Sequence, residues 1–320
     1  MARLAAGLIF KGKKDEVPFP LVTGRENIMS ELFRAEYQDH CDLCGPETKG
    51  LLWGKGDTYE ILRCPQCRLI WVNPLRYMRE ETSSYWAENV YISMAEIHRK
   101  RFRKFLQTFI TKIGLTKPSH FKILEVGSGF GYFLDVCEEF GIFAEGCDIS
   151  PIAVEFANKK RERVRLGTLD CYYSDESYDA IFAFNLIEHL PHPSLFLKEA
   201  RRVLRPGGFL CLETPIQESL FHKIAAAGFW LSGGRVNFLG IGPGGHIYKF
   251  SLKSFNLEKC GFQIKWYIKV SSPFKELWQK SSIVRFDYKL IYRSALPIVW
   301  TLSQAFGQGN RAFLIQQKVA

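Results

Sequence analysis

Four cysteines stand in two pairs whose spacing suits a metal ion. The pairs are Cys41-Asp-Leu-Cys44 and Cys64-Pro-Gln-Cys67, with 19 residues between them. Two such pairs can place four thiolates around one tetrahedral Zn²⁺. Four protein ligands leave no open position for a substrate, so we expect a structural zinc ion. The metal would stabilise a module that is too small to build its own core.

A second set of residues suits a nucleotide-like ligand. Three glycines follow a short apolar run in the pattern Glu125-x-Gly127-x-Gly129-x-Gly131, and a helix is predicted directly after them. Glycines permit tight turns and let a ligand approach the backbone, while a helix N-terminus presents free N–H groups. Asp148 ends the next predicted strand, where an acid accepts hydrogen bonds from ribose hydroxyls.

The segments that follow resemble one enzyme family. The glycine spacing is not the G-x-G-x-x-G of dinucleotide dehydrogenases. It resembles motif I of class I methyltransferases that depend on S-adenosylmethionine (SAM), and residues 177–215 match the family's fourth strand, "EHL" segment, "LRPGG" turn and fifth strand in order. Residues 245–262 resemble the "H-x-x-x-F-S … GF" segment of a branch that often carries an N-terminal CxxC/CxxC module.

The resemblance implies an α/β fold with a Rossmann-like seven-stranded sheet and helices on both faces, preceded by a small zinc ribbon and a helical linker. We expect an N-terminal extension at 1–35, the ribbon at 36–75, the linker at 76–118 and the methyltransferase domain at 119–320. The sixth and seventh strands are predicted at Phe262–Val270 and Arg311–Lys318. Cap insertions at 216–245 and 271–308 would shape the acceptor pocket.

The resemblance also assigns roles in cofactor binding. It implies that the methionine and ribose end of SAM lies against Glu125, Gly127, Gly129 and Gly131, and that Asp148 holds the ribose hydroxyls. Thr168 and Leu169 should border the adenine, with Asn185 at the mouth where the methyl group is transferred. The alternatives are a simple turn for the glycines, a helix-capping acid for Asp148 and ordinary loop packing for the other three.

Three residues are candidates for catalysis. Glu188 and His189 lie in a segment similar to the E-x-x-E-H of ubiquinone-pathway O-methyltransferases, which holds a divalent metal, but Asn185 replaces the first acid here and argues against the same metal site. His189 could instead be a general base or a histidine hydrogen-bonded for structure. His246 follows a glycine-rich segment that could act as a lid, and it is either a second base or a loop histidine.

The charge of the chain is positive without a basic domain. The formal net charge is +10, from 43 Lys and Arg against 33 Asp and Glu, and the excess is spread along the chain. The one dense run is residues 98–104, which is either a solvated helix face or a site for phosphate groups. The insertion at 271–308 mixes aromatic and basic residues, so it is either a cap packed on the sheet or a surface for a lipid-linked or phosphorylated acceptor at a membrane.

Location is predicted from cysteines and apolar runs. Five cysteines outside the pairs have apolar neighbours, which suits a reducing compartment. No run of 18 apolar residues occurs, and the short apolar stretch Leu4–Phe10 lacks a convincing cleavage site. We expect a cytoplasmic protein, with peripheral membrane contact left open.

These patterns favour a SAM-dependent methyltransferase. Its acceptor would be a small molecule such as a sugar, a polysaccharide precursor, a quinone or a lipid-linked precursor. One alternative is an RNA methyltransferase whose ribbon and basic run grip phosphates. A second is a zinc-ribbon interaction protein with a degenerate, inactive methyltransferase fold. The sequence does not predict the oligomeric state.

Overall fold

The computed structural model describes residues 33–319 apart from 57, 79–91, 235–236, 238, 243–244, 256 and 281–285. Most of the predicted N-terminal extension and part of the predicted linker lie outside the described residues. The centre of the molecule is a seven-stranded sheet in the order β10-β9-β8-β11-β12-β15-β14. The predicted α/β class with a Rossmann-like sheet is confirmed.

Within this sheet only β15 runs against the other strands. The parallel strands are β8 (Lys122–Val126), β9 (Phe143–Asp148), β10 (Val164–Leu166), β11 (Tyr178–Phe184) and β12 (Leu204–Pro215). β15 (Arg311–Lys318) is antiparallel to both β12 and β14 (Phe262–Val270), and these last two strands have the bounds predicted from the sequence. Because parallel strands end at one edge, the loops after β8, β9, β11 and β12 gather at that carboxyl edge.

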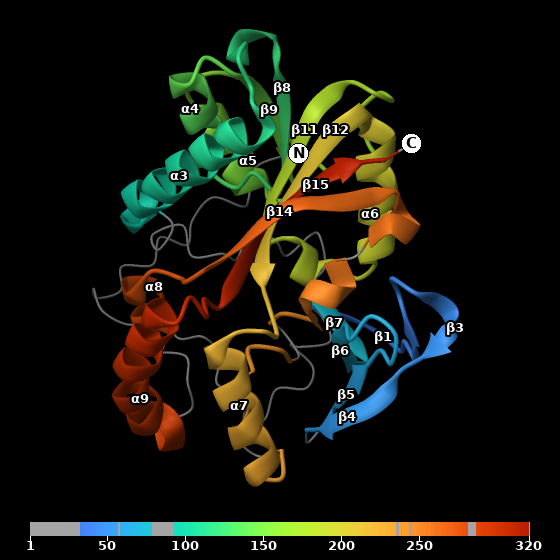
Figure 1. Ribbon diagram of the computed structural model, residues 1–320, viewed down its shortest axis with the longest axis vertical. Helices are drawn as coiled ribbons and strands as arrows, with labels where there is room; N and C mark the ends of the chain where they lie inside the picture. Colours follow the sequence, from blue (N-terminus) through green and yellow to red (C-terminus); the bar gives the residue numbers. More distant parts are fainter. Residues whose placement is uncertain are drawn as a thin grey trace, which may run out of the picture.

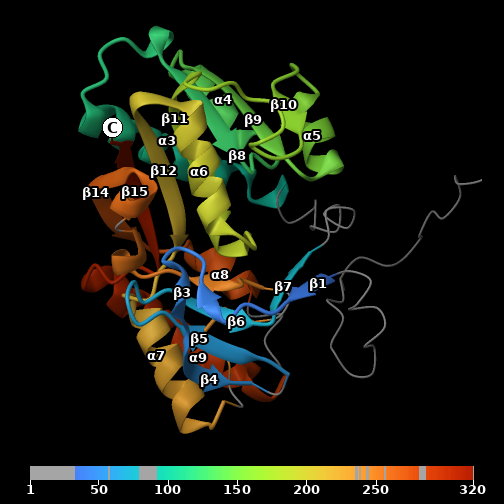
Figure 2. The ribbon, with the colours of Figure 1, turned by 90° about the vertical axis from the view of Figure 1, so that its right-hand side faces the viewer.

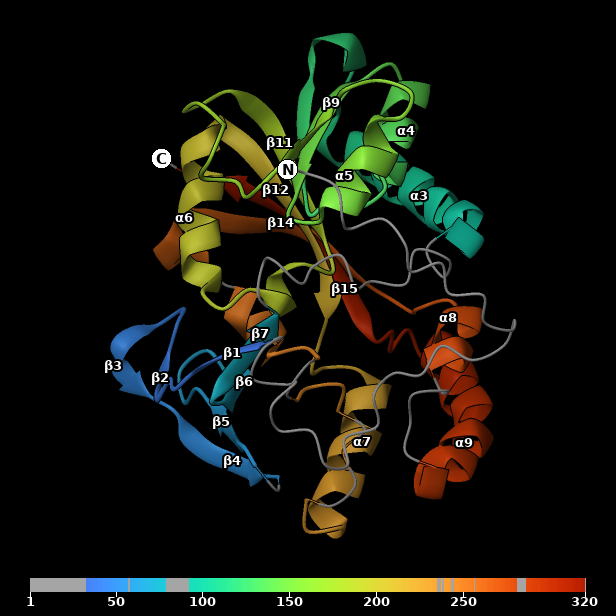
Figure 3. The same cartoon turned by 180° about the vertical axis from the view of Figure 1, so that it is seen from behind.

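Helices cover both faces of the sheet (Figures 1 and 3). α3 (Ala95–Ile113), α4 (Tyr132–Glu139) and α5 (Pro151–Asn158) lie on one face, and α6 (Pro193–Val203) lies on the other. α3 is amphipathic because aromatic residues recur at helical spacing on one side. Its buried rings pack on aromatic rings of α4 and the sheet: Phe102, Phe105 and Phe109 contact Phe133, Phe182, Phe184 and Phe313.

The cysteine module shares a sheet with the main domain (Figure 2). β4 (Leu51–Lys55), β5 (Glu60–Arg63) and β6 (Ile70–Asn73) are antiparallel neighbours. The fourth strand of their sheet is β13 (Tyr248–Lys249), which comes from the far end of the chain. Trp71 is fully buried, in the same apolar cluster as residues of α6 and β12. The module is therefore joined to the main domain by both backbone pairing and a common core.

The segment after the cysteine module differs from the predicted helical linker. β7 (Leu75–Met78) is a strand that pairs with β1 (Phe33–Glu36), and helix α3 begins only at Ala95. A second hairpin, β2 (His40–Cys41) and β3 (Gly45–Lys49), carries the first cysteine pair. The pairing of β1 with β7 is a contact between distant segments, so local sequence pattern did not reveal it.

The two insertions form helices near the carboxyl edge of the sheet (Figure 1). α7 (Leu220–Leu231) belongs to the first insertion, whereas α8 (Phe274–Lys280) and α9 (Phe286–Ala305) belong to the second. The described residues also form 3₁₀ turns at Pro118–His120, Ile187–His189, Leu252–Phe255 and Leu257–Cys260. Among the described residues, no helix is both long and apolar enough to cross a membrane.

A buried ring of four charges ties the second insertion to the sheet. Arg311 of β15 lies 2.7 Å from Glu276 of α8 and 3.5 Å from Glu213 of β12. Arg101 of α3 closes the ring at 3.5 Å from Glu213 and 4.0 Å from Glu276. Burial lets these charges interact strongly, and the removal of one partner would leave a charge unpaired in the core.

Candidate active site

The glycine loop after β8 leaves open space where a ligand could approach the backbone. Gly127, Gly129 and Gly131 all adopt positive φ, at 72°, 51° and 74°. A Cβ atom on Gly127 would lie 3.1 Å from Leu186, and one on Gly131 would lie 3.2 Å from Ala157. A Cβ atom on Gly129 would meet nothing within 4 Å, so this position faces open space. These glycines are required by conformation and, at Gly129, leave room for a ligand.

Asp148 lies beside this loop at the tip of β9. Its Oδ2 accepts the Gly129 N–H at 2.7 Å, and its Oδ1 accepts the Ser150 N–H at 2.9 Å. Burial raises the pKa of the Asp148 carboxyl, although these backbone N–H groups oppose the shift. The helix cap is Ser150, whose side chain accepts from Ala153 N. Each Asp148 oxygen keeps a lone pair that could accept a ribose hydroxyl.

The other residues expected at the cofactor lie along the same edge. Glu125 is 3% exposed, its Oε2 has no hydrogen-bond partner among the described residues, and burial raises its pKa. Thr168 is exposed, whereas the Leu169 side chain is packed in the core. Asn185 has φ of 51°, which is rare outside glycine, and its N–H donates to the Glu213 carbonyl. A buried acceptor and an open glycine loop are compatible with a bound SAM molecule.

The three catalytic candidates come together from distant segments. Glu188 and His189 belong to the turn after β11, and His246 precedes β13. Their carboxylate and imidazole atoms lie within 4.8 Å of one another, and the two imidazole rings are 4.7 Å apart. Thr214 donates to Glu188 Oε2 at 2.8 Å, and burial raises the pKa of Glu188 to about 7. The trio could pass a proton, or could hold a divalent cation with His246 in place of the missing acid.

Comparison with known proteins places this edge in a family. Residues 97–264, more than half of the chain, match the methyltransferase domain family. The chain belongs to this family. The matched region contains the glycine loop, Asp148 and all three catalytic candidates. The predicted site residues at the carboxyl edge therefore lie within the methyltransferase domain.

Curated relatives match the domain over part of their length. A probable SAM-dependent methyltransferase of Mycolicibacterium smegmatis is 35% identical over 96 residues, which is 29% of this chain and 37% of the relative. A sterol 4-C-methyltransferase of Caenorhabditis elegans is 28% identical over 121 residues, covering 35% and 36%. A demethylmenaquinone methyltransferase of Tropheryma whipplei is 33% identical over 94 residues, covering 28% and 39%. The chain thus spans less than half the length of these relatives.

The chain also matches a solved structure at low sequence identity. The structure of a putative sarcosine dimethylglycine methyltransferase from Galdieria sulphuraria covers 68% of this chain and 86% of its own, with 16% identity and a TM-score of 0.47.

The cysteine module holds its four sulfur atoms in one cluster beside the methyltransferase domain. All four Sγ atoms lie within 4.8 Å of one another, with Cys41–Cys67 at 3.6 Å and Cys64–Cys44 at 3.8 Å. Four thiolates around tetrahedral Zn²⁺ at about 2.3 Å would be separated by roughly 3.8 Å. A hydrogen bond from Cys41 lowers the pKa of Cys67 to about 6. The cluster fits a zinc ion in its spacing and its sulfur chemistry.

Ile247 is bonded both to the cysteine module and to the segment of Glu188. The Ile247 carbonyl accepts the N–H of Val72 in β6 at 3.1 Å, and its N–H donates to the Glu188 carbonyl at 3.0 Å. His246 precedes Ile247, and His189 follows Glu188. The backbone of the ribbon therefore contacts the His246 segment directly, and this segment in turn is bonded to the one that carries His189. Sequence alone could not reveal either contact.

Each cysteine pair is also attached to the methyltransferase domain. Asp42 of the first pair accepts the N–H and hydroxyl of Ser194, at the start of α6, at 2.6 and 3.0 Å. The carbonyl of Cys67 in the second pair accepts the Ser251 hydroxyl at 2.9 Å. Asp42 thus satisfies a free N–H of a helix N-terminus from another module.

The structure resolves the two interpretations of the basic run at 98–104. Its arginines pair with acids of the domain: Arg99 with Asp135 at 3.0 Å, Arg101 with Glu213, and Arg103 with Glu139 at 2.6 Å. These guanidinium groups are already neutralised, and Arg101 points into the core. The run lies on helix α3 with Lys100 and Lys104 exposed, so it is in part a solvated helix face, and its arginines are already paired with acids.

Sequence analysis missed Lys249 and the four-charge ring. Lys249 is 7% exposed, and burial lowers its pKa to about 8 while Glu188 opposes the shift. It follows His246 by three residues, so its position in the matched "H-x-x-x-F-S" segment was the available signal. Arg311 belongs to no motif, and Arg101 was noticed only as part of the basic run at 98–104. Their ion pairs could not be predicted, because each arginine pairs with acids more than 30 residues away.

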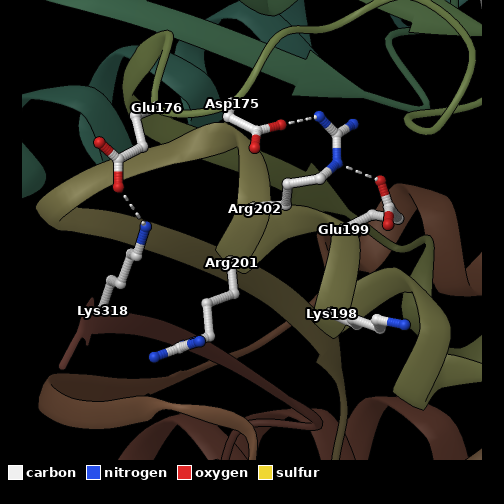
Figure 4. Close-up of a pocket in the computed structure, with 7 residues that line it drawn as sticks. All are labelled: Asp175, Glu176, Lys198, Glu199, Arg201, Arg202 and Lys318. Atoms are coloured by element: carbon white, nitrogen blue, oxygen red, sulfur yellow. Dashed lines mark hydrogen bonds and ion pairs between the residues drawn. The ribbon is translucent and has the colours of Figure 1, made fainter. Parts of the chain in front are cut away.

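A charged hollow on the surface is separate from the site (Figure 4). It has a volume of 360 Å³ and lies where Asp175 and Glu176 precede β11, at the amino edge of that strand. Arg202 pairs with Asp175 at 2.6 Å and with Glu199 at 2.7 Å, and Lys318 pairs with Glu176 at 3.7 Å. These pairs involve all three acids of the hollow, whereas Lys198 and Arg201 also line it. The hollow lies away from the carboxyl edge that carries the glycine loop.

Proposed function

We propose that the protein is a SAM-dependent methyltransferase that acts on a small molecule. The observation that carries the proposal is the convergence of Glu188, His189 and His246 at the carboxyl edge that also holds the glycine loop. SAM supplies an electrophilic methyl group on a sulfonium, which is already a good leaving group. The protein's main task is then to align the acceptor and exclude water.

The residues at this edge have distinct tasks in the proposed reaction. Asp148 and the glycine loop hold the ribose and methionine parts of the cofactor, with Glu125 beneath them and Thr168, Leu169 and Asn185 along the same edge. His189 or His246 accepts the proton that a hydroxyl or acidic carbon of the acceptor loses. When ionised, Glu188 would stabilise the imidazolium formed in that step, and its pKa near 7 lets it ionise at neutral pH.

The cysteine module has a structural task in this proposal. Cys41, Cys44, Cys64 and Cys67 would hold one zinc ion, and the protein would belong to the branch that carries such a ribbon. The support is the compact sulfur cluster and its backbone link to the catalytic candidates through Ile247. All four positions of the ion would be filled by protein, so it would take no part in the chemistry.

The acceptor is proposed as a sugar, a polysaccharide precursor, a quinone or a lipid-linked precursor. The names of the relatives, a sterol and a demethylmenaquinone methyltransferase, support an apolar or lipid-like molecule. RNA is disfavoured because the arginines of the basic run are paired with acids. An inactive interaction protein is disfavoured because the glycine loop and Asp148 are intact.

The first test is calorimetric titration with S-adenosylhomocysteine. Gly129→Arg should abolish one-to-one binding by filling the open space above the loop. Gly114→Arg is the matched control, because Gly114 also has positive φ and open space but ends α3. The cofactor assignment would be contradicted if the folded wild-type protein did not bind S-adenosylhomocysteine, or if Gly129→Arg still bound it. Confirmed binding would justify assays with sugar, quinone and RNA acceptors.

A further inference from the structure

The helices of the two insertions expose an apolar surface at one end of the molecule. α7 and α9 contact each other, and α7 lies between α9 and the cysteine module (Figures 1 and 3). Their exposed side chains include Leu231 at 89%, Leu290 at 77%, Ile298 at 63% and Trp230 at 57%. We call this surface the α7–α9 face; its further members are Ile224 and Leu302.

The exposed residues of α9 follow the spacing of one helix face. Leu290, Pro297, Ile298 and Leu302 are exposed at intervals that bring them to the same side, with no charge among them. Leu296 and Ser303 are buried, and Trp300 donates to the Ser272 carbonyl. α9 therefore already has a side packed on the protein, and its apolar outer side is additional. Exposed apolar stripes of this kind mark binding surfaces.

Among the described side chains of α7, α8 and α9, the exposed charges are positive. α7 contains Lys223, which is exposed, and no acidic residue. In α8 Lys275 is exposed, whereas Glu276 is turned inward to Arg311. Trp278 of α8 is 40% exposed, and Arg293 of α9 lies over its ring at 5.2 Å. Apolar side chains, tryptophans and flanking cations together are typical of a surface that binds anionic lipid.

We propose that the α7–α9 face binds an anionic membrane surface peripherally. The apolar side chains would enter the headgroup region, and the flanking cations would contact lipid phosphates. A second copy of the chain fits less well, because an isologous contact would bring the same cations together. α7 starts five residues after β12 ends at the carboxyl edge, so membrane binding would turn the active-site edge towards the lipid.

The test is co-sedimentation of the full chain with vesicles. Vesicles containing phosphatidylglycerol in phosphatidylcholine should bind the protein, and pure phosphatidylcholine should bind it less, with a difference that falls as salt is added. Leu231→Ser with Leu290→Ser should weaken binding about tenfold or more, because two exposed leucines lose their burial in lipid. The control is Leu195→Ser with Phe143→Ser, which are 57% and 50% exposed on other parts of the surface.

The readout does not depend on methyl transfer. Zinc content and S-adenosylhomocysteine binding report whether each variant is folded. Equal losses in both double variants, or no wild-type binding to anionic vesicles, would overturn the membrane assignment. A wild-type dimer that becomes monomeric in Leu231→Ser with Leu290→Ser, without vesicle binding, would assign the face to a second copy instead.

Discussion

The cofactor side and the acceptor side of this site are built in different ways. Glu125, the three glycines and Asp148 lie within 24 residues of chain and occupy two adjacent strands and their loops. Glu188, His189 and His246 come from separate segments, and the strand β6 that holds His246 in place lies near the start of the chain. A short segment can specify the first arrangement by itself, whereas the second exists only after distant segments have packed.

Because the two sides are built differently, we expect different mutations to damage each of them. The cofactor side should depend on its own hydrogen bonds and backbone conformations. The acceptor side should depend on elements that lie outside the catalytic candidates: the cysteine cluster, the four-charge ring and the contact of Asp42 with α6. Perturbation of either side should therefore leave the other largely in place.

The largest effect is expected from the loss of the metal. Cys64→Ser should release zinc and remove several kcal/mol of stability from the ribbon, because metal binding and folding are coupled in such modules. Hydrogen exchange should rise in β6 and β13 while β8 and β9 stay protected. Cys171→Ser, at an exposed cysteine outside the cluster, is the control. A full equivalent of zinc in Cys64→Ser would refute the four-thiolate site. If hydrogen exchange rose as much in β8 as in β6, the cofactor side and the acceptor side would not be independent.

The four-charge ring should give the next largest effect. Arg311→Met leaves Glu213 and Glu276 with Arg101 as the remaining partner in the ring, so we expect a loss of about 3–5 kcal/mol in the free energy of unfolding. Urea denaturation measures this change. Arg205→Met is the control, because Arg205 is 41% exposed and its pair with Asp179 should contribute less than about 1 kcal/mol. Similar losses in both variants would show that the ring has no special role.

Glu188 should make stability depend on pH. Its pKa is raised to about 7 in the folded protein, so folding favours the protonated form. The stabilisation is complete below the unfolded pKa near 4.5 and is lost as pH rises to about 7, which amounts to about 3 kcal/mol. Glu188→Gln should therefore match the wild type at pH 5 and be more stable at pH 8, as measured by denaturation. If the difference in stability between Glu188→Gln and the wild type were the same at pH 5 and pH 8, Glu188 would be ionised throughout this range.

Asp148→Ala tests the cofactor side. Loss of the hydrogen bonds to a charged group should weaken S-adenosylhomocysteine binding by roughly 1.5–3 kcal/mol, without release of zinc. Calorimetry and metal analysis measure the two outcomes. Asp175→Ala, in the charged hollow at the amino edge, is the control. If Asp148→Ala bound S-adenosylhomocysteine as tightly as the wild type, Asp148 would not be a cofactor-binding residue.

The smallest effect is expected where the first cysteine pair contacts α6. Asp42→Ala leaves the Ser194 N–H without its acceptor at the helix start, so stability should fall by about 1 kcal/mol. The control is Asp39→Ala, because Asp39 is exposed and pairs with the surface residue Lys49. If Asp42→Ala also lowered cofactor affinity, the two sides of the site would be coupled through α6.

The local sequence pattern was sufficient to predict some strands and loops. β14 and β15 have the predicted bounds, because β14 has apolar residues interleaved with polar ones and β15 has an apolar centre, and each follows a glycine-containing turn. The glycine loop and Asp148 lie where the motif predicted, because positive φ and a strand tip are properties of a few neighbouring residues. The four cysteines converge for a related reason, since the spacing of each pair suits a metal-binding knuckle.

Only the tertiary structure decided the rest. β7 is a strand rather than part of a helical linker because β1 lies beside it. The arginines of the basic run face acids from other elements, and Lys249 is buried because β13 completes the sheet of the cysteine module. Burial and charge pairing depend on which distant segments meet. The sequence therefore determined the glycine loop and the acid at the tip of β9, because these depend on neighbouring residues. Packing decided which distant segments bring Glu188, His189 and His246 together.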